Sequence, residues 1–254
     1  MNFGIHCAQV TLPFVRDLRS ADYQAGALLL IDKPQGWTSF DVVNKVRGAL
    51  RQHLQVKNIK VGHSGTLDPM ATGLLLVCTG RWTKELHHLT GLDKKYIGQI
   101  TLGLETDTYD AEGKVIESLP VPDLSKDSLE SHLSAFKGVL DQYPPAYSAI
   151  KKDGKPLYEL ARAGKEVKTE PRKVTVYDIN LLPYQAPVLE VMVHCGSGFY
   201  VRSLAHDLGQ KIGCGGHLSS LVRTSIGSYS LENAFSMKQF AEAFPRKENK
   251  QSDR

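Results

Sequence analysis

The 254-residue chain lacks the residue patterns that indicate a metal site, a disulfide framework or a membrane span. Its four cysteines lie far apart with no Cys-x-x-Cys pair, and its nine histidines include no His-Glu-x-x-His. The longest apolar run, AGALLLI, is far too short to cross a bilayer and is typical of a buried strand. We therefore expect a cytoplasmic protein with reduced thiols, no bound metal and no membrane segment.

Motifs of several common enzyme classes are also missing. The sequence has no Gly-x-Ser-x-Gly elbow, and GSG and GCGG supply neither Gly-x-Gly-x-x-Gly nor Gly-Lys-Ser/Thr. No cysteine lies in a setting that would activate it as a nucleophile. Asp107 and Asp110 in TDTYDAEG could form the carboxylate pair of a glycoside hydrolase. The same stretch is equally typical of a solvated turn, so both interpretations stay open.

The apolar pattern predicts one large domain of strands and single helices. Hydrophobic residues make up 41% of the chain, enough for a sizeable core. Thr38-x-x-Asp41 forms a capping box that predicts a helix to about Gln52, and Ser125 can cap another. Strands in sequence-adjacent pairs predict an α+β fold with a mixed, mostly antiparallel central sheet and flanking helices. The expected strands are Ala27–Asp32, Leu74–Cys78, KKYIGQITLG, VTVYDINLL and VLEVMVHC, with a last strand and helix near Arg223–Phe244.

The segment from about Tyr143 to Pro171 differs in composition from its surroundings. It holds a Pro-Pro pair, glycine breaks and several tyrosines. Eight Lys/Arg against four acids lie between Lys151 and Lys173, an excess as large as the net +4 of the whole chain. Contact with phosphates requires such a local excess, although many basic runs are only solvated faces. We expect the segment to project from the core with a short helix near Leu157–Ala163.

The stretch VGHSGTLDPMATG sets one carboxylate, Asp68, among glycines and other small residues. Backbone without side chains would let that carboxylate approach a ligand closely. An Asp-Pro pair also commonly caps the turn that the proline begins, and the local sequence favours this simpler role. We expect the stretch to form a loop.

Three further residues each have an ordinary and a functional interpretation. Arg202 lies in GFYVRSLAHDLG at the start of a predicted helix, where the dipole disfavours a cation, so a carboxylate partner is expected. A surface ion pair there would contribute little. Tyr96 alternates on a predicted strand as core tyrosines do, and His63 has the setting of an ordinary surface histidine.

Together, seven stretches in their order along the chain resemble the TruB family of tRNA pseudouridine-55 synthases. They are LLIDKPQGWTS, VGHSGTLDPMATGLL, KKYIGQITLG, TDTYDAEG, PPAYSAIKKDGKPLYELARAG, VTVY and GFYVRSLAHDLG. The resemblance covers roughly four-fifths of the chain, from about Ala27 to Ala234, and Gly-His-x-Gly-x-Leu-Asp-Pro is specific to the family. It implies a pseudouridine synthase fold and an isomerase that acts on uridine 55 in the T-loop of tRNA.

The family chemistry breaks the N1–C1′ bond of uridine, rotates the uracil and bonds C5 to C1′. Nothing is hydrolysed, so one carboxylate suffices, and the resemblance implies no metal or other cofactor. Asp68 would be the nucleophile, Arg202 would keep it ionised and aimed, and Asp110 would orient Arg202. Tyr96 would stack on the extruded uracil and assist proton transfer at C5.

The resemblance also implies residues that bind the substrate. His63 would enter the space that the flipped nucleotides leave in the RNA stack. Tyr200 and Leu221 would line the pocket, and Lys33 would pack or pair near the active-site loop.

Segment 143–171 corresponds to the family's thumb, which closes on the T-stem loop of tRNA. Lys151, Lys152 and Lys155 would contact phosphates there, while the shape of the loop and its unstacked bases would provide specificity. Residues 27–244 would form the catalytic domain, after an extension at 1–26 and before a disordered tail at 245–254. Many family members carry a C-terminal PUA domain, and the roughly twenty residues after Ala234 are too few for one. We expect a monomer without that domain.

One alternative to the enzyme remains open. The chain could be an RNA-binding or tRNA-folding module, in which thumb and flipping residues matter and isomerisation does not. The combination of Asp68, Tyr96 and Arg202 favours catalysis, because a binding module has no need of it.

Overall fold

The computed structural model describes residues 12–245 except 149, 153, 165, 166 and 168. Its elements follow one another as β1 (Leu28–Lys33), α1 (Ser39–Leu54), β2 (Val61–Ser64), β3 (Thr72–Thr79), η1 (Gly80–Glu85), α2 (Leu86–Gly91), β4 (Lys94–Leu102), β5 (Leu104–Thr106), β6 (Val115–Ser118), α3 (Lys126–Ser134), β7 (Gly138–Gln142), β8 (Lys151–Lys152), β9 (Lys155–Pro156), α4 (Leu157–Arg162), β10 (Arg172–Gln185), β11 (Val188–Cys195), α5 (Val201–Ile212), β12 (Gly216–Ile226), β13 (Tyr229–Ser230), η2 (Leu231–Asn233), β14 (Phe235–Ser236) and α6 (Met237–Ala243).

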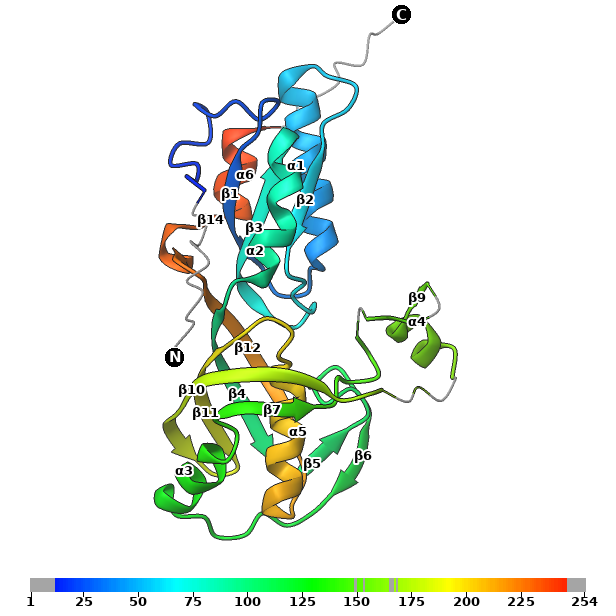
Figure 1. Cartoon of the computed structure of the whole chain (residues 1–254), viewed down its shortest axis with the longest axis vertical. Coiled ribbons are helices and arrows are strands. Elements are labelled where there is room, and N and C mark those ends of the chain that lie inside the picture. Colours follow the sequence, from blue (N-terminus) through cyan, green and yellow to red (C-terminus); the bar gives the residue numbers. More distant parts are fainter. Residues whose placement is uncertain (1–11, 149, 153, 165–166, 168, 246–254) are drawn as a thin grey trace, which may run out of the picture.

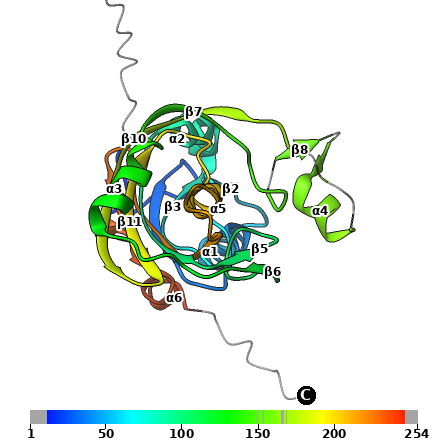
Figure 2. The same ribbon diagram turned by 90° about the horizontal axis from the view of Figure 1, so that it is seen from below.

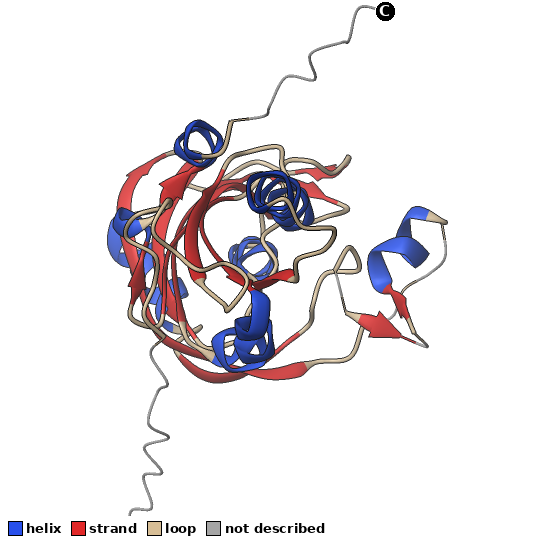
Figure 3. Cartoon of the chain, turned by 90° about the horizontal axis from the view of Figure 1, so that it is seen from above, coloured by secondary structure: helices blue, strands red, loops and turns tan. Residues whose placement is uncertain are grey.

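A ten-stranded sheet runs through the molecule in the order β14-β1-β3-β12-β4-β11-β10-β7, with β2 beside β3 and β13 beside β12. The β1–β14 and β3–β12 pairs are parallel and the other pairs of this sheet are antiparallel. The predicted α+β fold with a mixed, mostly antiparallel sheet is confirmed. Seen along the long axis, the sheet curves around α5 (Figures 2 and 3).

The apolar run of β1 is buried on both faces because helices cover both sides of this part of the sheet. Leu29 and Ile31 pack with α1 and α6, whereas Leu28 and Leu30 pack with α2 and the end of β12. The predicted capping box of Thr38 and Asp41 is present at the start of α1. These elements form the upper half of the molecule in Figure 1.

The lower half is built around α5, which packs on the concave side of β4, β10 and β11 (Figures 1 and 2). Strand β12 joins the halves, because it pairs with β3 through Val222 and Arg223 and with β4 along most of its length. The sequence predicted the last strand only near Arg223, so the first half of β12 was not expected. Its first residues include His217 and two serines, so their apolar signal is too weak to mark a central strand.

The prediction of a loop for the whole VGHSGTLDPMATG stretch is wrong at both of its ends. Val61–Ser64 form β2, which pairs with β3, and β3 itself begins at Thr72. Only Val61 in β2 has a typical strand side chain, so pairing with a neighbour determines this strand. The loop is confined to the residues around Asp68.

Segment 143–171 projects from the lower half, with β8, β9 and α4 at its far end (Figures 1 and 3). The short helix predicted near Leu157–Ala163 is α4. The segment leaves the sheet at the end of β7 and returns at the start of β10, which pair with each other. Both ends of the projection are therefore fixed by adjacent strands.

Candidate active site

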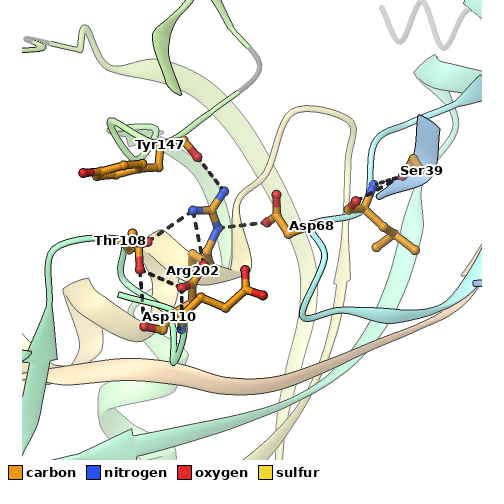
Figure 4. Close-up of polar contacts among 8 residues, drawn as sticks. Ser39, Asp68, Thr108, Asp110, Tyr147 and Arg202 are labelled. Carbon is orange, nitrogen blue, oxygen red and sulfur yellow. Dashed lines mark hydrogen bonds and ion pairs between the residues drawn. The ribbon is translucent and has the colours of Figure 1, made fainter. Parts of the chain in front are cut away.

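Asp68 begins the tight turn that Asp-Pro predicts, in the loop between β2 and β3. Its carbonyl accepts a hydrogen bond from the Ala71 N–H at 3.1 Å. The Ser39 hydroxyl, at the start of α1, donates to the Leu67 carbonyl (3.1 Å) and accepts from the Leu67 N–H (2.8 Å). The backbone thus closes the turn, while the carboxylate points toward Arg202 (Figure 4). Asp68 can therefore close the turn with its backbone and still act on a ligand with its carboxylate.

Lys33 anchors the other side of this loop. Its side chain is fully buried, and its ammonium donates to the carbonyls of Pro34 (3.0 Å), Trp37 (2.6 Å) and Pro69 (3.3 Å). Burial lowers the pKa of Lys33 to about 8, and the negative charge of Asp68 opposes that shift. Lys33 therefore fixes the backbone beside Asp68 and supplies positive charge nearby.

Arg202, in the first turn of α5, lies at the centre of the site and is almost fully buried. Its Nε is 2.9 Å from Asp68 Oδ2, the carboxylate partner expected for a cation at a helix start. Its two terminal nitrogens donate to the carbonyls of Thr108 (3.2 Å) and Tyr147 (2.9 Å). Figure 4 shows these contacts converging on the guanidinium. Arg202 is held from several sides, which fixes its direction toward Asp68.

Asp110 is buried on the far side of Arg202, and its Oδ2 lies 3.4 Å from Nη1 (Figure 4). Its Oδ1 accepts hydrogen bonds from the Thr108 hydroxyl (2.6 Å) and the Glu112 N–H (3.0 Å). Asp68 and Asp110 thus share one guanidinium between them.

The Asp68 carboxyl keeps some contact with solvent, since 36% of its side chain is exposed, against 5% for Arg202. Burial raises the pKa of Asp68 above its ordinary value. The charge of Arg202 opposes that rise, and the charge of Asp110 adds to it. Arg202 is thus the main group that keeps Asp68 ionised.

Two cavities meet at Asp68. An inner pocket of about 320 Å³ and an outer cleft of about 710 Å³ share Thr66, Leu67, Asp68 and Arg202 in their walls. Both volumes are in the range of pockets that hold small organic groups. The carboxylate therefore lies within reach of a group bound in either cavity.

Tyr96, Tyr200 and Leu221, three residues that the family resemblance implies at the base, all line the inner pocket. Tyr96 on β4 and Leu221 on β12 are each 8% exposed. Burial raises the pKa of Tyr96, against the opposing charge and hydrogen bond of Arg223. The Tyr96 phenol is therefore protonated at neutral pH and presents a ring and a neutral hydroxyl.

Arg223 is a residue of this pocket that the sequence analysis missed. It is 1% exposed on β12, and it donates from Nε to the Leu74 carbonyl (2.7 Å) and from Nη2 to the Gly65 carbonyl (3.0 Å). It thereby ties β12 to β3 and to the start of the Asp68 loop. A basic residue amid the strand LVRTSI was the available signal.

His63 lies on β2 and lines the outer cleft with Phe40 and Tyr158. Its Nδ1 is buried and has no hydrogen-bond partner among the residues that the structure describes. Burial lowers the pKa of His63, and the charge of Arg223 lowers it further. A neutral imidazole therefore lines the cleft, and its unused Nδ1 is buried behind it.

The structure does not pair Asp107 and Asp110 as a glycoside hydrolase would require. Asp107 accepts a hydrogen bond from the Lys114 N–H (2.8 Å) within its turn, whereas Asp110 is bound to Arg202. The two acids have separate partners, so neither is set up to act with the other across a bond.

Of the predicted phosphate contacts, Lys155 is exposed at the start of β9. The backbone of Lys151 and Lys152 forms β8, but their side chains lie outside the described residues. Arg162 and Tyr158, from α4, line the outer cleft. The projecting segment therefore forms one wall of the cleft that leads to Asp68.

Within the described part of the chain, no three His, Cys, Asp or Glu side chains are grouped so that they could hold a metal ion. None of the helices described there has the length and apolar character to cross a membrane.

Two protein-family models together match residues 51–254 of the chain. Residues 51–201 match the TruB family pseudouridylate synthase N-terminal domain, and residues 202–254 match the tRNA pseudouridylate synthase B C-terminal domain. The tRNA pseudouridine synthase B of Flavobacterium johnsoniae is 42% identical over 87% of this chain and 97% of its own length. That of Parabacteroides distasonis is 43% identical over 85% of this chain and 92% of its own length.

Solved structures of similar fold include a Cbf5-Nop10-Gar1 complex, with a TM-score of 0.65 and 27% identity over 87% of this chain. An H/ACA RNP bound to a substrate RNA containing 2′-deoxyuridine gives a TM-score of 0.61 and 24% identity over 89% of this chain. The chain spans 54% and 57% of the chains in those structures. The chain thus belongs to the TruB family of tRNA pseudouridine-55 synthases, isomerases that convert uridine to pseudouridine in tRNA.

Proposed function

We propose that Asp68 is the nucleophile of this isomerisation and that the target uridine is flipped out of the T-stem loop of tRNA. The observation that carries the proposal is the ion pair of Asp68 with the buried Arg202 where the outer cleft meets the inner pocket. A flipped nucleotide reaches Asp68 from the outer cleft and places its uracil against Tyr96 and Leu221.

The reaction exchanges one glycosidic bond for another within the same nucleotide. Asp68 either adds to C1′ as the N1–C1′ bond breaks or removes the 2′-proton to form a glycal. The uracil then rotates and C5 bonds to C1′; the Asp68–C1′ ester bond breaks in the first route, and Asp68 returns the proton to C2′ in the second. The proton then leaves C5, and N1 ends protonated. Neither water nor electrons are consumed, so one carboxylate can perform the step without a cofactor. Tyr96, as a neutral phenol, is placed to stack on the uracil and to relay the C5 proton.

Arg202 has the role of keeping Asp68 ionised, and Asp110 that of holding Arg202 from behind. Such fixed charges act strongly where water is excluded, because they need no reorganisation during the reaction. Lys33 and Arg223 hold the backbone on either side of Asp68 and act through that loop.

The thumb, residues 143–171, is proposed to close on the T-stem loop. Lys151, Lys152 and Lys155 contact phosphates, and Tyr158 and Arg162 face the RNA across the outer cleft. His63 on the opposite wall fills the place that the flipped nucleotides vacate. Residues 27–244 act as one catalytic domain, working as a monomer in the cytoplasm, where its tRNA substrate is.

Pseudouridine mapping of total tRNA tests the proposal. Cells that lack the protein should have uridine at position 55, and expression of the wild-type chain should restore pseudouridine there. Expression of Asp68→Asn or Asp68→Ala should not, because neither amide nor methyl can attack C1′ or take a proton. Restoration by either variant would refute the role of Asp68.

A further inference from the structure

Tyr109 has an unusual backbone conformation directly between the two residues that hold Arg202. Its φ of 63° is in the left-handed region, which residues other than glycine and asparagine seldom adopt. Its neighbours Thr108 and Asp110 contact the Arg202 guanidinium through a carbonyl and a carboxylate. Strain of this kind persists only where surrounding contacts stabilise it.

An aromatic stack provides one such contact. The Tyr109 ring lies flat on the His206 ring, with centroids 3.9 Å apart and planes only 11° from parallel. His206 is four residues after Arg202 on α5, so both side chains leave the same face of that helix. The stack therefore connects the loop that holds Arg202 to the helix that carries it.

The His206 ring is itself fixed from behind. Its Nδ1 lies 3.2 Å from Oε1 of Glu105, a buried residue of β5. The other oxygen of Glu105 accepts a hydrogen bond from Gln210, one turn further along α5. A His206 ring turned away from Tyr109 would move its Nδ1 away from Glu105.

Main-chain hydrogen bonds hold the same turn on both sides of Tyr109. The Tyr109 carbonyl accepts from the Leu218 N–H (3.0 Å), and the Ala111 N–H donates to the Leu218 carbonyl (3.0 Å). Both bonds lie on the C-terminal side of the Tyr109 Cα, whereas on its N-terminal side the Tyr109 N–H donates to the Thr106 carbonyl at 3.2 Å. The φ angle of Tyr109 sets how the Thr108 carbonyl is directed relative to the part that pairs with Leu218. The aromatic stack acts on this angle together with the bond to Thr106, and so contributes to the direction in which the carbonyl meets Arg202.

We propose that Tyr109 and His206 are positioning residues for Arg202: their stacked rings hold the left-handed turn that presents Thr108 and Asp110 to the guanidinium. The proposal rests on the proposed function of Arg202 as the partner of Asp68. Neither Tyr109 nor His206 lines the inner pocket or the outer cleft, and both residues are only partly buried. The stack affects the rate of isomerisation because it helps to set the direction of the Arg202 guanidinium, and it leaves the affinity for RNA unchanged.

The test compares Tyr109→Gly and Tyr109→Asn with Tyr109→Phe. Glycine and asparagine accept the left-handed conformation, so both remove the ring without adding strain. Phenylalanine keeps the ring. With T-arm RNA as substrate, kcat should fall about tenfold in the first two variants and stay within about twofold of wild type in the third. KM should change by less than about twofold in all three. The acid limb of kcat/KM should move to higher pH in the Gly and Asn variants, because a loosened Arg202 lowers the pKa of Asp68 less.

His206→Ala and His206→Phe extend the test to the other ring. The first should behave like Tyr109→Gly, and the second should recover most of the rate because it keeps a flat ring under Tyr109. Unfolding temperatures within a few degrees of wild type would confirm that the fold is unchanged.

Arg202→Met is the reference that separates the two proposals. Full activity of Arg202→Met would refute the function proposed for Arg202. A slow Arg202→Met together with wild-type kcat and pH profile in Tyr109→Gly would overturn the stack alone. A Tyr109→Phe as slow as Tyr109→Gly would also overturn it, because the ring would then not be the source of the effect.

Discussion

The surroundings of Asp68 and the projecting thumb use cationic side chains in opposite ways. Around Asp68, Lys33, Arg202 and Arg223 are buried and donate to backbone carbonyls. In the thumb, Lys155 is exposed, and α4 lies at the far end of a long projection (Figure 1). Buried cations fixed by carbonyls can hold a carboxylate in one geometry, whereas exposed cations can follow a phosphate backbone. The contrast supports the proposal that the first region performs the chemistry and the second binds RNA.

Among the cationic residues of the two regions, Arg202 should have the largest effect, since it contacts both Asp68 and Asp110. Arg202→Met should lower kcat by about 10²–10³-fold, in line with the loss of one fixed electrostatic partner. KM for T-arm RNA should stay within a few-fold. Steady-state kinetics on T-arm RNA measure both, with Arg162→Met as an arginine of the outer cleft that should change KM more than kcat. A kcat close to wild type in Arg202→Met would break the contrast between the regions.

Lys33 tests whether the buried cations also hold the loop. Lys33→Met leaves the carbonyls of Pro34, Trp37 and Pro69 without their donor, so the free energy of unfolding should fall by about 2–4 kcal/mol. Urea unfolding measures it. The matched control is Lys95→Met, an exposed lysine of β4, which should change stability by less than about 0.5 kcal/mol. Equal losses in the two variants would show that burial of Lys33 has no special role.

Substitutions in the thumb should weaken RNA binding and leave the rate of isomerisation unchanged. Replacing Lys151, Lys152 and Lys155 by glutamine should weaken T-arm RNA binding about tenfold or more and reduce the slope of log K against log salt by about 2. The rate at saturating RNA should be nearly unchanged. Glutamine at Lys126, Lys211 and Lys238 removes the same charge from α3, α5 and α6, away from the cleft, and should leave the slope as it is. An unaltered slope in the thumb variant would contradict phosphate contact there.

The smallest effect concerns pH. Burial and Asp110 raise the pKa of Asp68, and Arg202 lowers it. Activity requires the ionised carboxylate, so kcat/KM should be fully present above that pKa and fall as the pH drops through it. Asp110→Asn should move this acid limb to lower pH, and Arg202→Met should move it to higher pH. Shifts of the same sign in the two variants would contradict the arrangement of charges around Asp68.

More of the fold than of the candidate site could be predicted from the sequence. Patterned elements such as β1 and α1 follow from their apolar runs and caps, and the carboxylate partner of Arg202 follows from its position in a helix start. Strand β2 did not follow, because Val-Gly-His-Ser forms a strand only by pairing with β3. Asp68 itself looked like a turn residue, and only the resemblance of the whole chain to a family marked it as catalytic.

The backbone contacts of Lys33 and Arg223 could not be predicted for a related reason. Arg223 and Lys33 find their acceptors on segments far away in the chain or around a turn, and no local pattern encodes such contacts. The same holds for Tyr109 and His206, whose stacking joins residues 109 and 206 through the path of β4, β5 and α5. Contacts that depend on the tertiary fold can be identified only from the structure.

The most direct test of the central claim is single-turnover kinetics and RNA affinity measured side by side for Asp68→Asn. With a T-arm RNA radiolabelled at the target uridine, the variant should form pseudouridine at least about 10⁴-fold more slowly than wild type. It should bind the RNA with an affinity within a few-fold of wild type, because its thumb is unchanged and asparagine has nearly the size of aspartate in the walls of both cavities. Turnover near the wild-type rate would contradict the assignment of the chemistry to Asp68.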